Sequence, residues 1–157
     1  MLQNPQAHEP HPAETISAYL AEDHGRLGSL LAAVSVQMAE GRLEEAKAAW
    51  GPYEAGLCRH LRLEEELLFP VFEVRSGLSD GPTVSLRIEH REIRRIAALL
   101  RGGVEREDPA AFADGLRLLG EVLADHESKE EHVLYPTTDA LLAPGERARF
   151  LARLRRE

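Results

Sequence analysis

The sequence predicts an all-α protein, an up-down four-helix bundle with a short additional helix at its C-terminal end. Three observations predict it. Apolar residues recur at helical spacing in four long segments, short breaks rich in glycine and proline separate these segments, and no stretch shows the period-two alternation of a β-strand. Residues 1–12 contain three prolines and are expected to form a flexible leader, followed by a single domain over residues 13–157.

The first two helices are expected on either side of Gly41. Apolar positions from about residue 13 to residue 39 keep helical spacing and predict the first helix. A second helix is expected from about residue 43 to residue 74. We expect a disturbance at residues 51–53, "GPY", because proline removes a backbone donor and clashes with the preceding turn.

The second pair of helices follows the loop "SGLSDGP". A third helix is expected to begin near Thr83 and to end at the "RGG" motif. Asp108 as N-cap and Pro109 at the first helical position predict the start of a fourth helix, which continues to about Tyr135. The segment "GERARFLARLRRE", about residues 145–156, predicts a last short helix that packs across the end of the bundle.

Composition excludes several classes of function. The net charge of −8 argues against sequence-independent binding of nucleic acid, because such binding needs a basic surface. No apolar run approaches the roughly 20 residues that span a bilayer, so no membrane partner is expected. The N-terminal residues lack the basic and apolar regions of a secretory signal. A single cysteine, Cys58, cannot form an intramolecular disulfide and is expected to be a buried, inert thiol, so we expect a cytoplasmic protein.

One acidic sequence motif occurs twice in the chain. "HLRLEEELLFP" begins at His60, and "HESKEEHVLYP" begins at His126, sixty-six residues later. The same shift relates histidines in the first and third helices, each with an acid immediately before it. The matched residues are His24 and His90, His60 and His126, and Glu64 and Glu130. The two halves of the chain therefore repeat one helical hairpin.

The spacing of the repeat suggests a shared site. Positions i and i+4 of an α-helix are about 40° apart around the axis, so His60 and Glu64 point the same way. If this direction is the bundle interior, four imidazoles and two carboxylates meet in one volume, and such a cluster needs cations. The alternative is a repeat whose histidines and glutamates are solvated surface groups. That alternative does not account for histidine at four matched positions.

The residue types point to a class of metal. Imidazole and carboxylate without thiolate suit iron or manganese and tolerate zinc. Each half supplies two histidines, and the two carboxylates could bridge a pair of metals. Six protein ligands for two metals leave positions open for a small ligand. Ferritin-like bundles use a different spacing, Glu-x-x-His, which this chain lacks.

These motifs resemble the hemerythrin family, in particular its bacterial branch with the His-His-Glu cation-binding domain. The resemblance covers about residues 13–136 and is carried by His24, "HLRLE" from His60, "EH" at His90 and "HESKE" from His126. It implies a non-haem di-iron centre, with two iron ions as the cofactor and a carboxylate bridge between them. Under this resemblance His24 and His60 serve one iron, His90 and His126 serve the other, and Glu64 and Glu130 bridge them.

The chain departs from the oxygen-carrying members of the family at Arg94. Those proteins have a His-x-x-x-His pair on the third helix, where this chain has His90 followed by Arg94. Their fourth-helix carboxylate is an Asp one residue further along, where this chain uses Glu130. An arginine cannot ligate a cation, so the departure argues against simple oxygen carriage.

The sequence therefore favours a protein that binds or reacts with a small diatomic or peroxide ligand, such as oxygen, nitric oxide or peroxide, in a protective role. An iron- or gas-responsive sensor without turnover is the alternative, and a zinc or manganese site without a redox task is a third. The ligand count is compatible with reversible binding and with turnover, so enzyme activity stays open, as does the oligomeric state.

Several other residues have expected supporting roles. Glu65 and Glu131 lie about 100° further round their helices than Glu64 and Glu130, and are expected to support the ligands or to lie on the surface. Arg94 shares the face of His90, and either supports the site or extends into solvent. Phe69 and Tyr135 are expected to be core residues at the end of the bundle.

Overall fold

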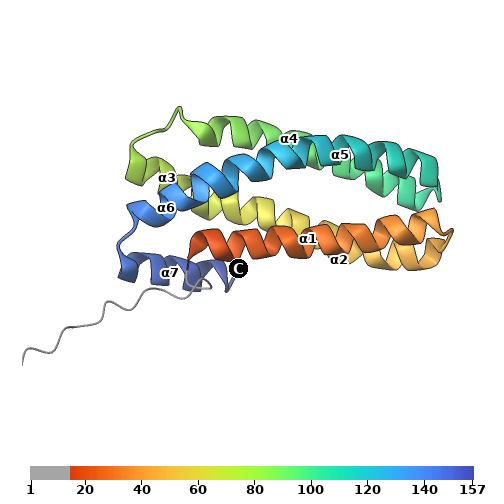
Figure 1. The fold of residues 1–157 in the computed structure, drawn as a ribbon, viewed down its shortest axis with the longest axis horizontal. Helices are drawn as coiled ribbons and strands as arrows, with labels where there is room; N and C mark the ends of the chain where they lie inside the picture. The colour runs from red at the N-terminus through yellow and green to blue at the C-terminus, as the bar shows by residue number, and fades with distance from the viewer. Residues whose placement is uncertain (1–14) are drawn as a thin grey trace, which may run out of the picture.

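The computed structural model describes residues 15–157, and within that range it contains helices and no strand. The chain forms an up-down bundle of four helical rods with a short helix packed at one end (Figure 1). The fold class predicted from the sequence is confirmed. The leader expected at residues 1–12 lies outside the described residues.

The first two rods form one hairpin. α1 (Ile16–Ala39) begins at Thr15, whose side chain accepts a hydrogen bond from the Ala18 N–H, as an N-cap does. α2 (Leu43–Leu63) runs back beside α1 and continues through a π-helical segment, η2 (Glu64–Leu68), into α3 (Phe69–Ser76).

The third and fourth rods form the second hairpin. α4 (Pro82–Glu105) is followed by α5 (Pro109–Lys129), which continues through a second π-helical segment, η3 (Glu130–Leu134), into α6 (Tyr135–Leu141). Asp108 is the N-cap of α5, as predicted, because its carboxylate accepts from the Ala111 N–H at 3.0 Å. The last helix, α7 (Pro144–Leu154), packs beside the start of α1 in Figure 1.

The expected disturbance at residues 51–53 is absent from the described structure, so that prediction is wrong. Pro52 lies inside α2, and the helix passes through it without a break. Both Pro52 and Ala48, whose carbonyl loses its α-helical donor there, are exposed. The carbonyl can therefore bind water, and the proline costs less than it would in a buried turn.

The "RGG" motif does not end the third helix, because α4 continues to Glu105. Gly103 is buried where α4 meets α5, and a Cβ atom at this position would lie 3.0 Å from the backbone nitrogen of Phe112. Glycine is thus required here for the close approach of two helices. It does not mark a helix end.

Cys58 is exposed, which contradicts the expectation of a buried thiol. The buried stripe of α2 runs through Leu57, His60 and Leu61. Cys58 lies about 100° from Leu57 around the helix and is turned out of the bundle.

The apolar core forms two clusters along the bundle. One cluster, which includes Leu31, Trp50 and Leu100, fills the end where both hairpins turn. The other, which includes Leu20 and Leu86, lies at the opposite end. α7 adds Phe150, Leu151 and Leu154 to this second cluster, so its predicted packing across the bundle end is confirmed. Among the described residues, none of the helices combines the length and the apolarity that a membrane crossing requires.

Candidate metal centre

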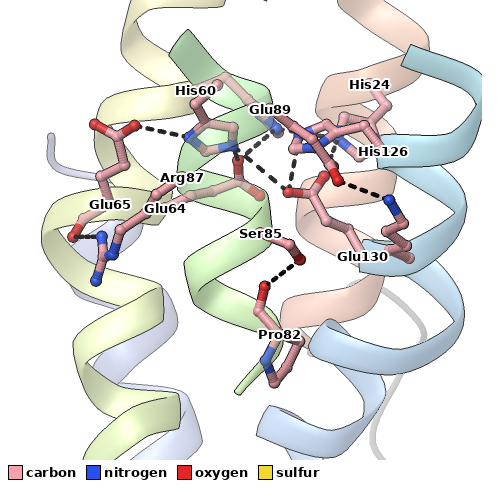
Figure 2. A network of polar contacts seen from close by, with 12 residues as sticks. His24, His60, Glu64, Glu65, Pro82, Ser85, Arg87, Glu89, His126 and Glu130 are labelled. Carbon is pink, nitrogen blue, oxygen red and sulfur yellow. Dashed lines mark hydrogen bonds and ion pairs between the residues drawn. The ribbon is translucent and has the colours of Figure 1, made fainter. Parts of the chain in front are cut away.

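The structure brings all six predicted ligand residues together between the two apolar clusters, with one or two residues from each rod. Each of the six is buried, and the two carboxylates are completely so. Figure 2 shows Glu64 and Glu130 reaching toward one another between the helices. The full set is His24 on α1, His60 and Glu64 on the second rod, His90 on α4, and His126 and Glu130 on the fourth rod.

The six residues form two overlapping groups, each with one ligand atom per residue. Within a group these atoms all lie within 4.8 Å of one another. The first group contains His24 and His60, the second contains His90 and His126, and both contain Glu64 and Glu130. The grouping matches the pairing that the family resemblance implies.

The facing atoms of the second group lack hydrogen-bond partners among the described residues. They are the inward-facing atoms Glu64 Oε2, Glu130 Oε1, His90 Nε2 and His126 Nε2. His126 Nε2 lies 3.1 Å from Glu130 Oε1, and His90 Nε2 lies 3.3 Å from Glu64 Oε2, without hydrogen-bond geometry. Unpaired polar atoms in a buried volume cost free energy, and a cation between them would remove that cost. The donor set therefore fits a metal ion.

Every one of the four histidines binds an outer carboxylate through Nδ1. The pairs are His24 with Glu131 at 2.8 Å, His60 with Asp23 at 3.0 Å, His90 with Glu65 at 2.9 Å, and His126 with Glu89 at 2.9 Å. Because a carboxylate accepts, each Nδ1–H donates outward and each Nε2 faces the interior. Carboxylate–histidine pairs of this kind orient metal-binding imidazoles and raise their basicity.

The outer carboxylates follow the repeat of the sequence. Asp23 and Glu89 each bind the second histidine of their own hairpin, His60 and His126. Glu65 and Glu131 instead reach across to the first histidine of the other hairpin. The imidazoles are thus held by two kinds of acid: the residues directly before His24 and His90, and the second glutamate of each repeated motif. The supporting role predicted for Glu65 and Glu131 is borne out by these contacts.

Arg94 contacts one of these outer carboxylates. Its two terminal nitrogens lie 2.8 and 3.0 Å from the two oxygens of Glu65, the acid that also binds His90. Of the two readings that the sequence left open, support of the site is correct and extension into solvent is wrong. Arg94 supports the site by binding Glu65, and no contact joins it to the central carboxylates of Glu64 and Glu130.

Other cations contact the remaining outer acids. Arg26 binds Asp23 at 2.7 Å, and Lys129 binds Glu89 at 2.6 Å. Even so, the carboxylates of the cluster outnumber the cationic side chains that contact them. Protons on the imidazoles or bound metal cations must balance the rest.

The contacting carboxylates favour the protonated form of two of the histidines, His24 and His90. Burial lowers the pKa of His24 and His90, but the interactions with Glu130 and the other nearby carboxylates outweigh it, so each pKa rises to about 9. Burial raises the pKa of Glu130, but the close approach of His126, His24 and His90 brings it well below its ordinary value. Cationic imidazoles therefore face an ionised carboxylate, and metal ions can take the place of these protons.

The hydroxyl of Tyr135 lies inside the cluster. Its oxygen is 2.5 Å from Glu64 Oε1, 3.0 Å from Glu130 Oε2 and 3.2 Å from His24 Nε2. Tyr135 is buried, as expected of a core residue, and in addition its hydroxyl contacts the cluster, whereas the sequence favoured packing alone. Burial raises the pKa of Tyr135, as do the charges of Glu64 and Glu130.

The π-helical segments account for this position. In a regular α-helix, residue i+5 lies about 140° from residue i, which would turn Tyr135 away from Glu130. Here the Tyr135 N–H binds the Glu130 carbonyl, and the Phe69 N–H binds that of Glu64, in the i→i+5 pattern of a π-helix. A proline follows each aromatic residue and has no N–H, so the hydrogen-bond ladder can change register there. Each aromatic side chain therefore faces the site.

A small pocket adjoins the cluster on the side of the first hairpin. It has a volume of about 40 Å³, which exceeds the roughly 10–15 Å³ that one water molecule needs. Its lining is mostly apolar and includes three histidines. The lining residues are His24, Leu27, Gly28, Leu31, Tyr53, Leu57, His60, Leu61, Leu123, His126 and Glu127.

The pocket coincides with a break in the repeat. The sixty-six-residue shift relates Gly28 to Arg94. On the helix of His90 this position is Arg94, whose long side chain binds Glu65. On the helix of His24 it is Gly28, which has no side chain, and a Cβ atom there would have nothing within 4 Å. The space next to His24 stays open as a result.

The fold and site define a class: four-helix bundles with a buried histidine–carboxylate metal site. The family is more specific, because residues 15–138 match the model of the hemerythrin HHE cation-binding domain. The chain belongs to the hemerythrin family. Comparison with curated proteins gave no match, and neither did comparison with solved structures.

Proposed function

We propose that the protein is a non-haem di-iron protein that binds or reacts with a small oxidant in a protective role in the cytoplasm. Two iron ions would each be held by one pair of histidines and by both carboxylates. The pairs are His24 with His60 and His90 with His126, with Glu64 and Glu130 shared.

The observation that carries the proposal is the set of unpaired atoms at the centre of the bundle. Two carboxylates without solvent exposure share one volume with four imidazoles, and four of the facing atoms lack hydrogen-bond partners among the described residues. A purely structural network would satisfy these atoms. Nitrogen and oxygen donors without thiolate favour iron or manganese, and membership of a cation-binding family supports a metal.

Access for a small ligand supports the oxidant part of the proposal. The pocket of about 40 Å³ reaches His24, His60 and His126, and its size suits a diatomic molecule or peroxide. A bound iron pair with open coordination positions would supply the electrons and the binding positions for such a ligand. The chain would contribute a dry approach lined by leucines and fixed imidazoles whose Nδ1 atoms are held by carboxylates.

The test begins with metal content. Protein purified from its native host should contain iron, whereas zinc or manganese alone would indicate a site without this redox task. The iron-loaded protein is then reduced anaerobically, and oxygen, nitric oxide or peroxide is added. We expect a change in the optical spectrum with at least one of them, and no change when the double variant Glu64→Gln/Glu130→Gln, which lacks the carboxylates shared by both metal groups, is treated in the same way. An unchanged spectrum with every oxidant would refute the proposal.

A second candidate is an iron- or gas-responsive binding module without turnover. It is favoured by the origin of the ligands, which come from all four rods, so that metal occupancy would tie the rods together. Metal binding then supplies folding free energy. This candidate requires a large stability difference between metal-free and loaded protein, and a partner that recognises one form only. Equal melting temperatures for the two forms would count against it.

A further inference from the structure

We infer that the phenol oxygen of Tyr135 is a ligand of the metal held by His24 and His60, and that the two metal positions are therefore chemically different. The inference rests on the proposed function, because it needs a metal at this position. It goes beyond the six histidine and glutamate ligands by adding a donor of another type to one position only.

The first argument is where the oxygen lies. Its three nearest polar atoms are Glu64 Oε1, Glu130 Oε2 and His24 Nε2, at 2.5, 3.0 and 3.2 Å. All three belong to residues of the first metal group, and His60 Nε2 lies 3.0 Å from His24 Nε2. The phenol oxygen thus shares one small volume with ligand atoms from every member of that group.

The second argument is burial. Tyr135 has no solvent exposure, so its hydroxyl has no access to bulk water and must find its partners inside the cluster. A cation placed among Glu64, Glu130 and His24 takes up the same lone pairs that the hydroxyl now contacts. Binding as a phenolate releases the phenol proton, and the carboxylate of Glu64, which accepts from the hydroxyl at 2.5 Å, is placed to take it. A phenolate is a hard oxygen donor of the kind that suits iron, as the carboxylates are.

The third argument is the contrast between the halves. The sixty-six-residue shift relates Tyr135 to Phe69. Phe69 stacks on His90 with ring centroids 5.4 Å apart, much as Tyr135 packs on His24 at 5.8 Å. The two aromatic rings occupy equivalent places, but Phe69 offers no oxygen. The position of His90 and His126 therefore lacks the extra donor.

The test uses the charge-transfer absorption that ferric iron shows when a phenolate binds it. The protein is loaded with iron, oxidised and analysed for metal content before its visible and resonance Raman spectra are recorded. We expect a visible band whose excitation enhances tyrosinate ring vibrations. Tyr135→Phe should abolish the band while the protein still binds iron. Tyr53→Phe is the matched control, because Tyr53 is also buried and lines the pocket beside His60.

Each outcome decides the inference. Iron-loaded wild type without the band, or a band that disappears in Tyr53→Phe and persists in Tyr135→Phe, would overturn it while leaving the di-iron proposal intact. A chain that binds no iron would overturn both. If Tyr135→Phe does not fold, the double variant Tyr19→Phe/Tyr53→Phe leaves Tyr135 as the only tyrosine of the three, and the band must persist in it.

Discussion

Glu65 and Arg94 form a two-pronged ion pair, and the carboxylate that Arg94 holds also accepts the Nδ1–H of His90. The arginine occupies the helix position where oxygen-carrying hemerythrins have a further histidine. Here Arg94 acts indirectly: it fixes the carboxylate of Glu65, which in turn fixes the imidazole of His90. Bidentate pairing leaves Glu65 little freedom to rotate, so the orientation of His90 depends on a residue that never touches the centre.

Replacing Arg94 should weaken metal binding more than it weakens the fold. In Arg94→Ala protein we expect the affinity for iron to fall about tenfold or more, the range seen when the outer partners of metal ligands are removed. The free energy of unfolding of the metal-free protein should change by no more than about 1 kcal/mol, because Arg94 is partly exposed. A competition titration against a chelator and a urea unfolding curve measure the two effects.

Arg95→Ala is the matched control for this variant. It removes the same charge from the next residue of α4, where Arg95 pairs with Glu92 on the surface. Its iron affinity should equal that of the wild type. Equal losses in both variants would mean that only overall charge matters, and would contradict the role given to the Glu65–Arg94 pair.

The metal-free protein should lose stability as the pH rises above neutrality. The pKa of His24 and His90 is about 9 in the folded protein, above the value of 6.5 expected in the unfolded chain. Their contribution to the free energy of unfolding is therefore complete below pH 6.5 and is lost as the pH rises through about 9. Urea unfolding at several pH values measures it.

The loaded protein should not share this loss, because a metal replaces the proton on each Nε2. The stability difference between loaded and metal-free protein should consequently widen between pH 6.5 and pH 9. Parallel pH profiles for the two forms would show that the imidazoles do not exchange protons for metal.

Filling the pocket should slow access without removing the metals. In Gly28→Leu protein the new side chain enters the space beside His24, since a Cβ there meets nothing within 4 Å. We expect unchanged iron content and a rate of azide or nitric oxide binding at least tenfold lower. Stopped-flow absorption measures the rate.

Gly25→Leu is the control for the glycine substitution itself. Gly25 is an exposed glycine of α1 with equally open surroundings, and it is not among the residues that line the pocket. Both variants should gain up to about 1 kcal/mol from better helix propensity. If Gly25→Leu slows ligand binding as much as Gly28→Leu does, the pocket is not the route.

Removing one histidine should empty one position and leave the other. His90→Ala protein keeps His24, His60, Glu64 and Glu130, which form the complete first group. We expect it to retain one tightly bound iron per chain. His132→Ala should retain both, because His132 is exposed on the fourth rod. Metal analysis after gel filtration would contradict the assignment if His90→Ala protein kept two irons.

The sequence predicted which six residues meet in the buried cluster because the repeat is strict there. His60 and Glu64 recur as His126 and Glu130 at unchanged spacing, as the proposed two-metal centre would require. The helical spacing of apolar residues was likewise sufficient to predict the four helical rods. The repeat also predicted that Glu65 and Glu131 are equivalent, although their partners in the opposite hairpin became visible only in the structure.

What the sequence missed depends on packing and on backbone register. Gly103 resembles a helix end, and only the approach of Phe112 shows why glycine lies there. Pro52 resembles a break, and only its exposure shows why the helix continues. Tyr135 was predicted to be a core residue, and only the i→i+5 turn after Glu130 shows that its hydroxyl reaches the site. The proline after each aromatic residue was the signal that could have indicated this change.

The measurement that tests the central claim most directly is the number of tightly bound iron ions per chain after anaerobic loading with ferrous iron and removal of the excess. The account predicts two for the wild type and none for the double variant Glu64→Gln/Glu130→Gln, because both metal groups share these carboxylates. One iron or fewer in the wild type, or two that remain when both carboxylates are gone, would contradict it.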